Sequence, residues 1–294
     1  MKLIQSRENP FFKELVKLAG SARQRNKAGQ TLLDGAHLLS AYLDAGFRPL
    51  HVLLGTSANA ECVDLVSCLN DVPVTQFDDK LLAELSELKT TTGILALIEI
   101  PAPNGHGNNA TPDNETRHAR SLTPVPPLPK GEGYDSSLRE FHVKSSDANF
   151  ALLLEDIQDP GNLGSMLRSA AAAGCDAVFL SPGCADAWSP RVLRAAMGGH
   201  FCLAIHESQD LKVVAHAFSG TLLATSLQAS RTLYECDLTS PVAFMMGNEG
   251  AGLSGELLQL ATHPVTIPMP GKVESLNVAA ATAICLFEVV RQRC

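Results

Sequence analysis

Three glycine-containing segments in the second half of the chain combine polar side chains with sharp backbone turns. The first, residues 159–168, contains Asn162, Gly164 and Arg168. Glycines there can leave backbone N–H groups free at a helix start, where an anion binds, and a guanidinium can hold a phosphate by a bidentate contact. An ordinary glycine-rich turn beside a surface arginine has the same residue types. Both interpretations stay open for this segment alone.

The second segment, residues 247–254, reads Gly-Asn-Glu-Gly-Ala-Gly-Leu-Ser and directly follows an apolar run. Three glycines in six residues indicate that the backbone approaches another group closely. The spacing differs from the dinucleotide-binding fingerprint, and the Gly-Lys-Ser/Thr of a P-loop is missing. We expect Ser254 to cap the next helix and the loop to be functional as well.

The third segment, residues 267–279, reads Ile-Pro-Met-Pro-Gly-Lys-Val-Glu-Ser-Leu-Asn-Val-Ala. Ser275 is predicted to be the N-cap of a terminal helix that runs to about residue 291. An alanine-rich helix with a polar start suits a pocket wall, a subunit interface or simple close packing. Local rules do not separate these three interpretations.

Taken in order, N-x-G-x-x-x-R, G-N-E-G-x-G-L-S and I-P-M-x-G-x-x-x-S-L-N-V resemble the signature motifs of the SpoU (TrmH-like) RNA 2′-O-ribose methyltransferases of the SPOUT superfamily. The first hundred residues resemble that family's L30e-like substrate-binding domain. The matching residues are Ser6, Asn9-Pro10, Arg25 and Asp34-Gly35, where Asp34 replaces the usual glutamate.

The resemblance implies an S-adenosylmethionine-dependent enzyme that methylates a ribose 2′-hydroxyl, works as a homodimer and ends in a trefoil knot. It assigns catalytic roles by motif position to Asn162, Arg168, Glu249, Ser275 and Asn277. It places the cofactor against Thr225, Ser226, Leu227, Gly247, Asn248, Gly252, Ile267, Met269 and Leu276.

Arg168 is the family's proposed key residue, sometimes described as a base. Because a guanidinium has a pKa above about 12, we expect it to act as an electrostatic clamp that lowers the pKa of the 2′-hydroxyl. Asn162 and Asn277 would position the phosphate or the ribose, and Ser275 would donate a hydrogen bond there. Glu249 would hold either its loop or Arg168.

Short apolar runs alternate with helical patterns on both sides of a proline-rich stretch. Strands are expected near residues 51–54, 72–74, 94–98, 151–154, 177–180, 221–224, 242–246 and 263–267, and helices near 11–18, 36–45, 59–69 and 79–87. Continuous apolar strands between helices predict an α/β fold with a parallel sheet, whose ligands bind beyond the carboxyl ends of the strands. We expect an RNA-binding domain at 1–100, a flexible linker or insertion at 101–148 and a methyltransferase domain at 149–294.

Charge is distributed unevenly along the 294 residues. The formal net charge of −8 is typical of a protein that does not bind nucleic acid, yet residues 1–30 hold seven basic residues against two acidic ones. We expect this basic stretch to face RNA rather than DNA, through Arg7, Lys13, Arg23 and Arg25.

Composition and spacing exclude several other classes. The eight cysteines form no C-x-x-C pair and no metal-ligand spacing, and the chain has no apolar run of about 20 residues. We therefore expect reduced thiols, no metal, no membrane and a cytoplasmic location. The two-domain arrangement favours large-subunit (23S-type) ribosomal RNA as substrate. A transfer RNA methyltransferase, a catalytically silent RNA-binding or ribosome-assembly factor, and the less favoured dinucleotide-dependent enzyme are the alternatives.

Overall fold

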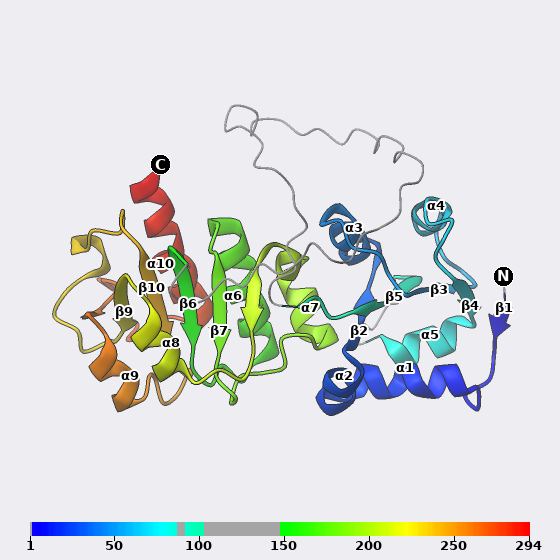
Figure 1. Ribbon diagram of the computed structural model, residues 1–294, viewed down its shortest axis with the longest axis horizontal. Coiled ribbons are helices and arrows are strands. Elements are labelled where there is room, and N and C mark those ends of the chain that lie inside the picture. Colours follow the sequence, from blue (N-terminus) through cyan, green and yellow to red (C-terminus); the bar gives the residue numbers. More distant parts are fainter. Residues whose placement is uncertain (1, 87–91, 103–147) are drawn as a thin grey trace.

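The computed structural model describes residues 2–86, 92–102 and 148–294, so nearly all of the expected linker lies outside the described residues. Figure 1 shows two sheets side by side, each covered by helices. The first belongs to the N-terminal part of the chain and the second to the C-terminal part.

The first sheet has five strands in the order β1-β4-β3-β5-β2. Strand β5 is antiparallel to both of its neighbours, and the other pairs are parallel. The strands are β1 (Lys2–Ile4), β2 (Gln30–Asp34), β3 (His51–Gly55), β4 (Val74–Phe77) and β5 (Ile94–Glu99). The helices are α1 (Pro10–Gly20), α2 (Ala22–Ala28), α3 (Ala36–Asp44), α4 (Ala60–Ser67) and α5 (Asp79–Leu85). Helices α1 and α5 pack on one face, and α3 and α4 on the other (Figure 1).

The second sheet has six strands, all parallel, in the order β11-β9-β10-β6-β7-β8. The strands are β6 (Phe150–Leu154), β7 (Ala177–Leu180), β8 (Ala204–His206), β9 (Thr221–Thr225), β10 (Val242–Met246) and β11 (His263–Val265). The helices are α6 (Pro160–Ala173), α7 (Pro190–Ala196), α8 (Leu211–Ala217), α9 (Gly255–Leu260) and α10 (Val278–Arg293). Helices α8 and α9 cover one face, and α6, α7 and α10 the other. The predicted α/β fold with a doubly covered parallel sheet is confirmed.

Most of the predicted elements are present, and their local signals explain them. Asn9 caps α1 by accepting from the N–H of Phe11 at 2.9 Å, and proline occupies the first helical position. The predicted range 72–74 for one strand was wrong, because β4 begins at Val74 and runs to Phe77. Six short elements were not predicted individually: β1 and β8 have three residues each, β2 has five, and α2, α7 and α8 have seven each.

A buried ion pair joins the two parts of the chain. Arg25 is 4% exposed, and its Nε donates to Oδ2 of Asp186 at 2.8 Å. Its Nη1 donates to two carbonyl oxygens at the end of α1, at 2.6 and 2.9 Å. The hydroxyl of Thr31 also donates to the carbonyl of Trp188 at 2.7 Å. The expectation that Arg25 faces RNA is therefore corrected, because its guanidinium is already paired inside the protein.

The buried imidazole of His200 lies next to this junction. Its Nε2 lies 2.6 Å from the carbonyl oxygen of Ala187, its ring packs against Trp188 with centroids 5.0 Å apart, and its Nδ1 has no partner in the described structure. Burial lowers the pKa of His200 to about 4, against an ordinary value of 6.5. The imidazole is therefore neutral in the folded protein at neutral pH.

Removing the guanidinium of Arg25 leaves the Asp186 carboxylate unpaired in the junction. We expect Arg25→Ala to lower the free energy of unfolding by about 3 kcal/mol and Arg25→Lys, which keeps the charge but loses the bidentate contact, by less. Urea unfolding of the full chain measures both values. Equal stability of wild type and Arg25→Ala would contradict this role.

The depressed pKa of His200 links stability to pH. Between about pH 4 and 6.5 the unfolded chain binds a proton at His200 that the folded protein does not, so stability falls as the pH falls through that window, by up to about 3 kcal/mol. We expect His200→Gln to have a smaller pH dependence there. Parallel unfolding curves for the two proteins from pH 7 to pH 4 would disprove the linkage.

Candidate functional site

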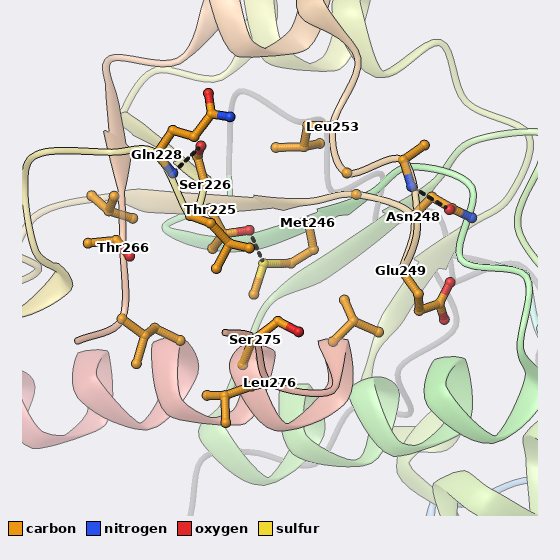
Figure 2. Close-up of a pocket in the computed structure, with 18 of the residues that line it drawn as sticks. Thr225, Ser226, Gln228, Met246, Asn248, Glu249, Leu253, Thr266, Ser275 and Leu276 are labelled. Atoms are coloured by element: carbon orange, nitrogen blue, oxygen red, sulfur yellow. Dashed lines mark hydrogen bonds between the residues drawn. The ribbon is translucent and has the colours of Figure 1, made fainter. Parts of the chain in front are cut away.

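A cavity of about 710 Å³ lies where β9, β10 and β11 end. Its walls come from residues 225–228, from residues 246–253 and from the segment that leads from β11 into α10. Figure 2 shows Thr225 and Ser226 on one wall, Asn248 and Glu249 on the loop after β10, and Ser275 and Leu276 beside α10. The prediction that the motif loops meet beyond the carboxyl ends of parallel strands is confirmed.

Gly247 allows the loop after β10 to close on itself. A Cβ atom at this position would lie 2.2 Å from backbone atoms of Gly252 and Leu253, which is well inside the van der Waals contact distance. The turn is completed by the N–H of Gly252, which donates to the carbonyl of Asn248 at 2.9 Å. The sequence predicted that the backbone of this loop approaches another group closely. In the structure that group is the far end of the same loop, at Gly252 and Leu253.

Asn248 organises the interior of the same loop. Its Oδ1 accepts from the N–H groups of Gly250 and Ala251 at 2.9 and 3.0 Å (Figure 2). At the end of the loop Ser254 caps α9, as predicted. The loop therefore enters the cavity with a fixed shape.

One amide connects all three motif segments. Nδ2 of Asn162 donates to Oε1 of Glu249 at 2.8 Å, and Oδ1 of Asn162 accepts from Nδ2 of Asn277 at 2.9 Å. Asn162 and Asn277 are 115 residues apart in the sequence. Glu249 contacts Asn162 and not Arg168. This contact agrees with the expectation that Glu249 holds its loop and not with the expectation that it holds Arg168.

The start of α10 differs from the prediction. Oδ1 of Asn277 accepts from the N–H groups of Ala279 and Ala280 at 2.9 and 3.4 Å, so Asn277 is the N-cap. Ser275 is not the N-cap. It lies before the helix and lines the cavity instead.

The cavity brings together most of the predicted site residues. It is lined by Glu249, Ser275 and Asn277 and by all nine residues expected to contact the cofactor: Thr225, Ser226, Leu227, Gly247, Asn248, Gly252, Ile267, Met269 and Leu276. Among the lining residues that the sequence did not predict are Met246 and Gln228. Met246, whose sulfur accepts from the hydroxyl of Thr225 at 3.2 Å, looks like any core residue of an apolar run. Its position at the end of β10 was the signal that could have identified it.

Arg168 does not line the cavity of its own chain. It is the ninth residue of the 14-residue helix α6, more than two turns from the start. Its side chain is exposed, and no residue in the described ranges forms a hydrogen bond or ion pair with it. The guanidinium is therefore free to meet a group from outside this chain.

The predicted RNA-facing residues lie in different environments. Arg7 is exposed and forms an ion pair with Glu84 at the end of α5, in which Nε of Arg7 donates to Oε1 of Glu84 at 2.9 Å. Lys13 is exposed and pairs with Glu8, and Arg23 is exposed on α2. Only Arg25 is buried.

No three His, Cys, Asp or Glu side chains in the part of the chain that the structure describes converge in a way that could hold a metal ion. No helix there is both long and apolar enough to span a bilayer.

Two family models match the chain. The SpoU rRNA methylase family matches residues 149–287, and the MRM3-like substrate binding domain matches residues 9–96. The first match spans all six strands of the second sheet, and the second match spans β2, β3, β4 and part of β5 in the first sheet.

Individual proteins are similar over most or half of the chain. A Synechocystis protein named as an uncharacterized tRNA/rRNA methyltransferase is 32% identical over 99% of this chain and 94% of its own length. The 23S rRNA (guanosine(2553)-2′-O)-methyltransferase RlmP of Bacillus subtilis is 38% identical over 50% of this chain and 60% of its own length. A crystal structure described as an RNA 2′-O ribose methyltransferase is 28% identical, superposes with a TM-score of 0.74 and covers 99% of both chains.

The self-contact at Gly247 predicts a sharp steric effect. We expect Gly247→Ala to lower the unfolding free energy by about 2 kcal/mol, because its Cβ meets backbone atoms that cannot move aside independently. Gly255→Ala is the matched control, since a Cβ there meets nothing within 4 Å. Denaturant unfolding compares the two, and similar stabilities would disprove the close approach.

Proposed function

This chain belongs to the SpoU rRNA methylase family, and from that premise we propose that it transfers a methyl group from S-adenosylmethionine to a ribose 2′-hydroxyl of large-subunit ribosomal RNA. The observation that carries the proposal is the amide of Asn162, which ties Glu249 and Asn277 together at a cavity. Residues from three motifs thus form one polar cluster beside a ligand-sized space.

The cavity suits S-adenosylmethionine in size and chemistry. Its volume of about 710 Å³ lies in the range of small-molecule sites. Ile267, Met269 and Leu276 provide apolar contacts for a purine, and the loop after Gly247 offers backbone groups to the polar parts of the ligand. S-adenosylmethionine supplies an electrophilic methyl group on a sulfonium.

The protein's own contribution is to orient the ribose and favour loss of its proton. Arg168 provides an unpaired positive charge that binds the adjacent phosphate and lowers the pKa of the 2′-hydroxyl. Asn162, Asn277 and Ser275 hold the ribose or its phosphate by hydrogen bonds, and Glu249 keeps Asn162 in place. Alignment of the hydroxyl with the methyl group is the larger part of the rate gain.

Ribosomal RNA is the proposed substrate because the Bacillus relative is named for guanosine 2′-O-methylation of 23S rRNA. The exposed cations Arg7, Lys13 and Arg23 would contact RNA phosphates, although Arg7 and Lys13 would exchange their present carboxylate partners for them. We therefore prefer 23S-type ribosomal RNA over transfer RNA as the substrate. The polar cluster argues against a catalytically silent factor.

We place a second copy of the chain against α10 in a homodimer. Leu227, Val273 and Leu276 near the cavity and Phe287 on α10 are exposed apolar side chains, 64%, 64%, 37% and 47% accessible. A partner that covers these side chains would also bring its own copy of Arg168 towards the cavity. This arrangement agrees with the finding that Arg168 does not line the cavity of its own chain.

The finer architecture follows from the family. The segment between β11 and α10 would thread a trefoil knot, supported by its position against the loops after β9 and β10. The five-stranded sheet would be the L30e-like RNA-binding domain at 1–100, followed by the methyltransferase domain at 149–294. Eight unpaired cysteines and a ribosomal substrate fit a cytoplasmic location.

Two measurements test the function. We expect calorimetry to detect S-adenosylmethionine binding to wild type and to Arg168→Ala alike, because the proposed role of Arg168 is to bind the RNA phosphate and not the cofactor. Methylation of ribosomal RNA, followed with labelled cofactor and mapped as 2′-O-methylribose, should fall at least about 100-fold in Arg168→Ala. Lys212→Ala, on α8, is the control. Near-wild-type methylation by Arg168→Ala would overturn the role of this residue.

A tagged heterodimer locates Arg168 relative to the site that it serves. If Arg168 acts on the partner's cavity, a dimer of one Arg168→Ala chain and one Gly247→Ala chain has one intact site and about half of the wild-type activity. No recovery would place Arg168 at the cavity of its own chain.

A further inference from the structure

We propose that Glu155 and Asp156, the two residues after β6, are positioning residues that set the place of the loop 247–253. The inference deepens the proposed function and rests on it, since it takes S-adenosylmethionine as the ligand of this loop. Neither residue lines the cavity, so both would act through the loop.

Glu155 holds both ends of the loop. Its backbone N–H donates to the carbonyl of Met246 at 2.9 Å, directly before the loop begins. Its Oε2 accepts from the N–H of Ser254 at 2.7 Å, directly after the loop ends. A carboxylate that accepts from a backbone N–H forms a stronger bond than a neutral acceptor does. One residue therefore fixes the separation between the two ends.

Asp156 holds the interior of the loop. Its carbonyl oxygen accepts from Nδ2 of Asn248 at 2.9 Å. The other end of the Asn248 amide accepts from Gly250 and Ala251. Because both ends of this amide are used, a shift of the Asp156 carbonyl moves the whole turn.

The backbone of Asp156 is held in an uncommon conformation. Its φ of 53° lies in the left-handed region, which costs a non-glycine residue on the order of 1 kcal/mol. Ser181 holds it there by a reciprocal pair: the N–H of Asp156 donates to Oγ at 2.9 Å, and the hydroxyl donates to Oδ1 of Asp156 at 2.6 Å. Return to an extended conformation would rotate the carbonyl away from Asn248.

Gly183, two residues after Ser181, shows how closely the Asp156 side chain is packed. A Cβ at Gly183 would lie 2.2 Å from Oδ1 of Asp156. The carboxylate of Asp156 therefore fills the space against the loop after β7. The end of β7 thus supports the end of β6, which in turn supports the loop after β10.

Positioning through the loop predicts a selective kinetic effect. Loss of either support should raise the Kd and KM for S-adenosylmethionine more than the KM for RNA, because the loop lines the cavity itself and reaches the proposed RNA-positioning residues only through the contact of Glu249 with Asn162. A purely structural role would change thermal stability and both KM values together.

The test compares Glu155→Ala, Glu155→Gln and Ser181→Ala with wild type as full-length protein. We expect Glu155→Ala and Ser181→Ala to bind S-adenosylmethionine about tenfold more weakly by calorimetry, and Glu155→Gln, which keeps an acceptor, within about threefold of wild type. Hydrogen exchange of amides 247–254 in the free protein should be faster in the two alanine variants. Glu256→Ala, which breaks only an exposed ion pair on α9, is the matched control.

The outcomes separate this inference from the proposed function. Unchanged Kd values with unchanged exchange would overturn the inference, as would equal losses in stability and in both KM values. Failure of wild type to bind S-adenosylmethionine would overturn the proposed function instead, and the exchange rates would still decide whether the loop is positioned as inferred. Ser181→Ala, which deletes a single hydroxyl, carries the same test if Glu155→Ala does not fold.

Discussion

The parallel alignment of β9, β10 and β11 is the constraint on which the site depends. Parallel strands carry their carboxyl ends to one edge of a sheet, so the segments that follow them meet there although they are distant in the sequence. The sheet is buried on both faces and cannot shift its register without exposing apolar residues. The cavity is the space left at this edge between three loops.

Polar side chains then convert that edge into a defined site. The two ends of the Asn162 amide join the loop of Glu249 to the start of α10 at Asn277, and Asn277 at the same time caps that helix. Asp156 and Asn248 form a second connection on the other side of the loop. The contacts of Asn162 with Glu249 and Asn277 lie at the surface, whereas the contact of Asn248 with the Asp156 carbonyl is partly buried. The loop is thereby held from both sides, which is the preorganisation that a methyl-transfer site needs.

The N-terminal sheet is joined to the C-terminal part of the chain by a buried charge pair. Arg25 and Asp186 are 5% and 15% exposed in their side chains, so separating the two parts would leave two charges without partners. Burial of Arg25 also removes one cation from the basic stretch at 1–30. The remaining cations of this stretch lie on the surface of a protein whose net charge is −8.

The sequence by itself determined the α/β class, the doubly covered parallel sheet, most helix and strand positions, and many of the residues that line the cavity. Those features follow from apolar runs, from caps such as Asn9 and Ser254, and from motif spacing, all of which act within a few residues. The tertiary structure alone decided that Arg25 is buried, that Asn277 rather than Ser275 caps α10, and that Arg168 lies outside the cavity of its own chain. It also brought Glu155 and Asp156 to the loop after β10. For Arg25 and for the loop after β10 the physical reason is the same: burial and hydrogen-bond partners are set by contacts between residues far apart in the sequence, such as the 161 positions that separate Arg25 from Asp186, and no local pattern records them. The cap of α10 is a local contact, but the amide of Asn277 that forms it also bonds to Asn162, 115 residues away.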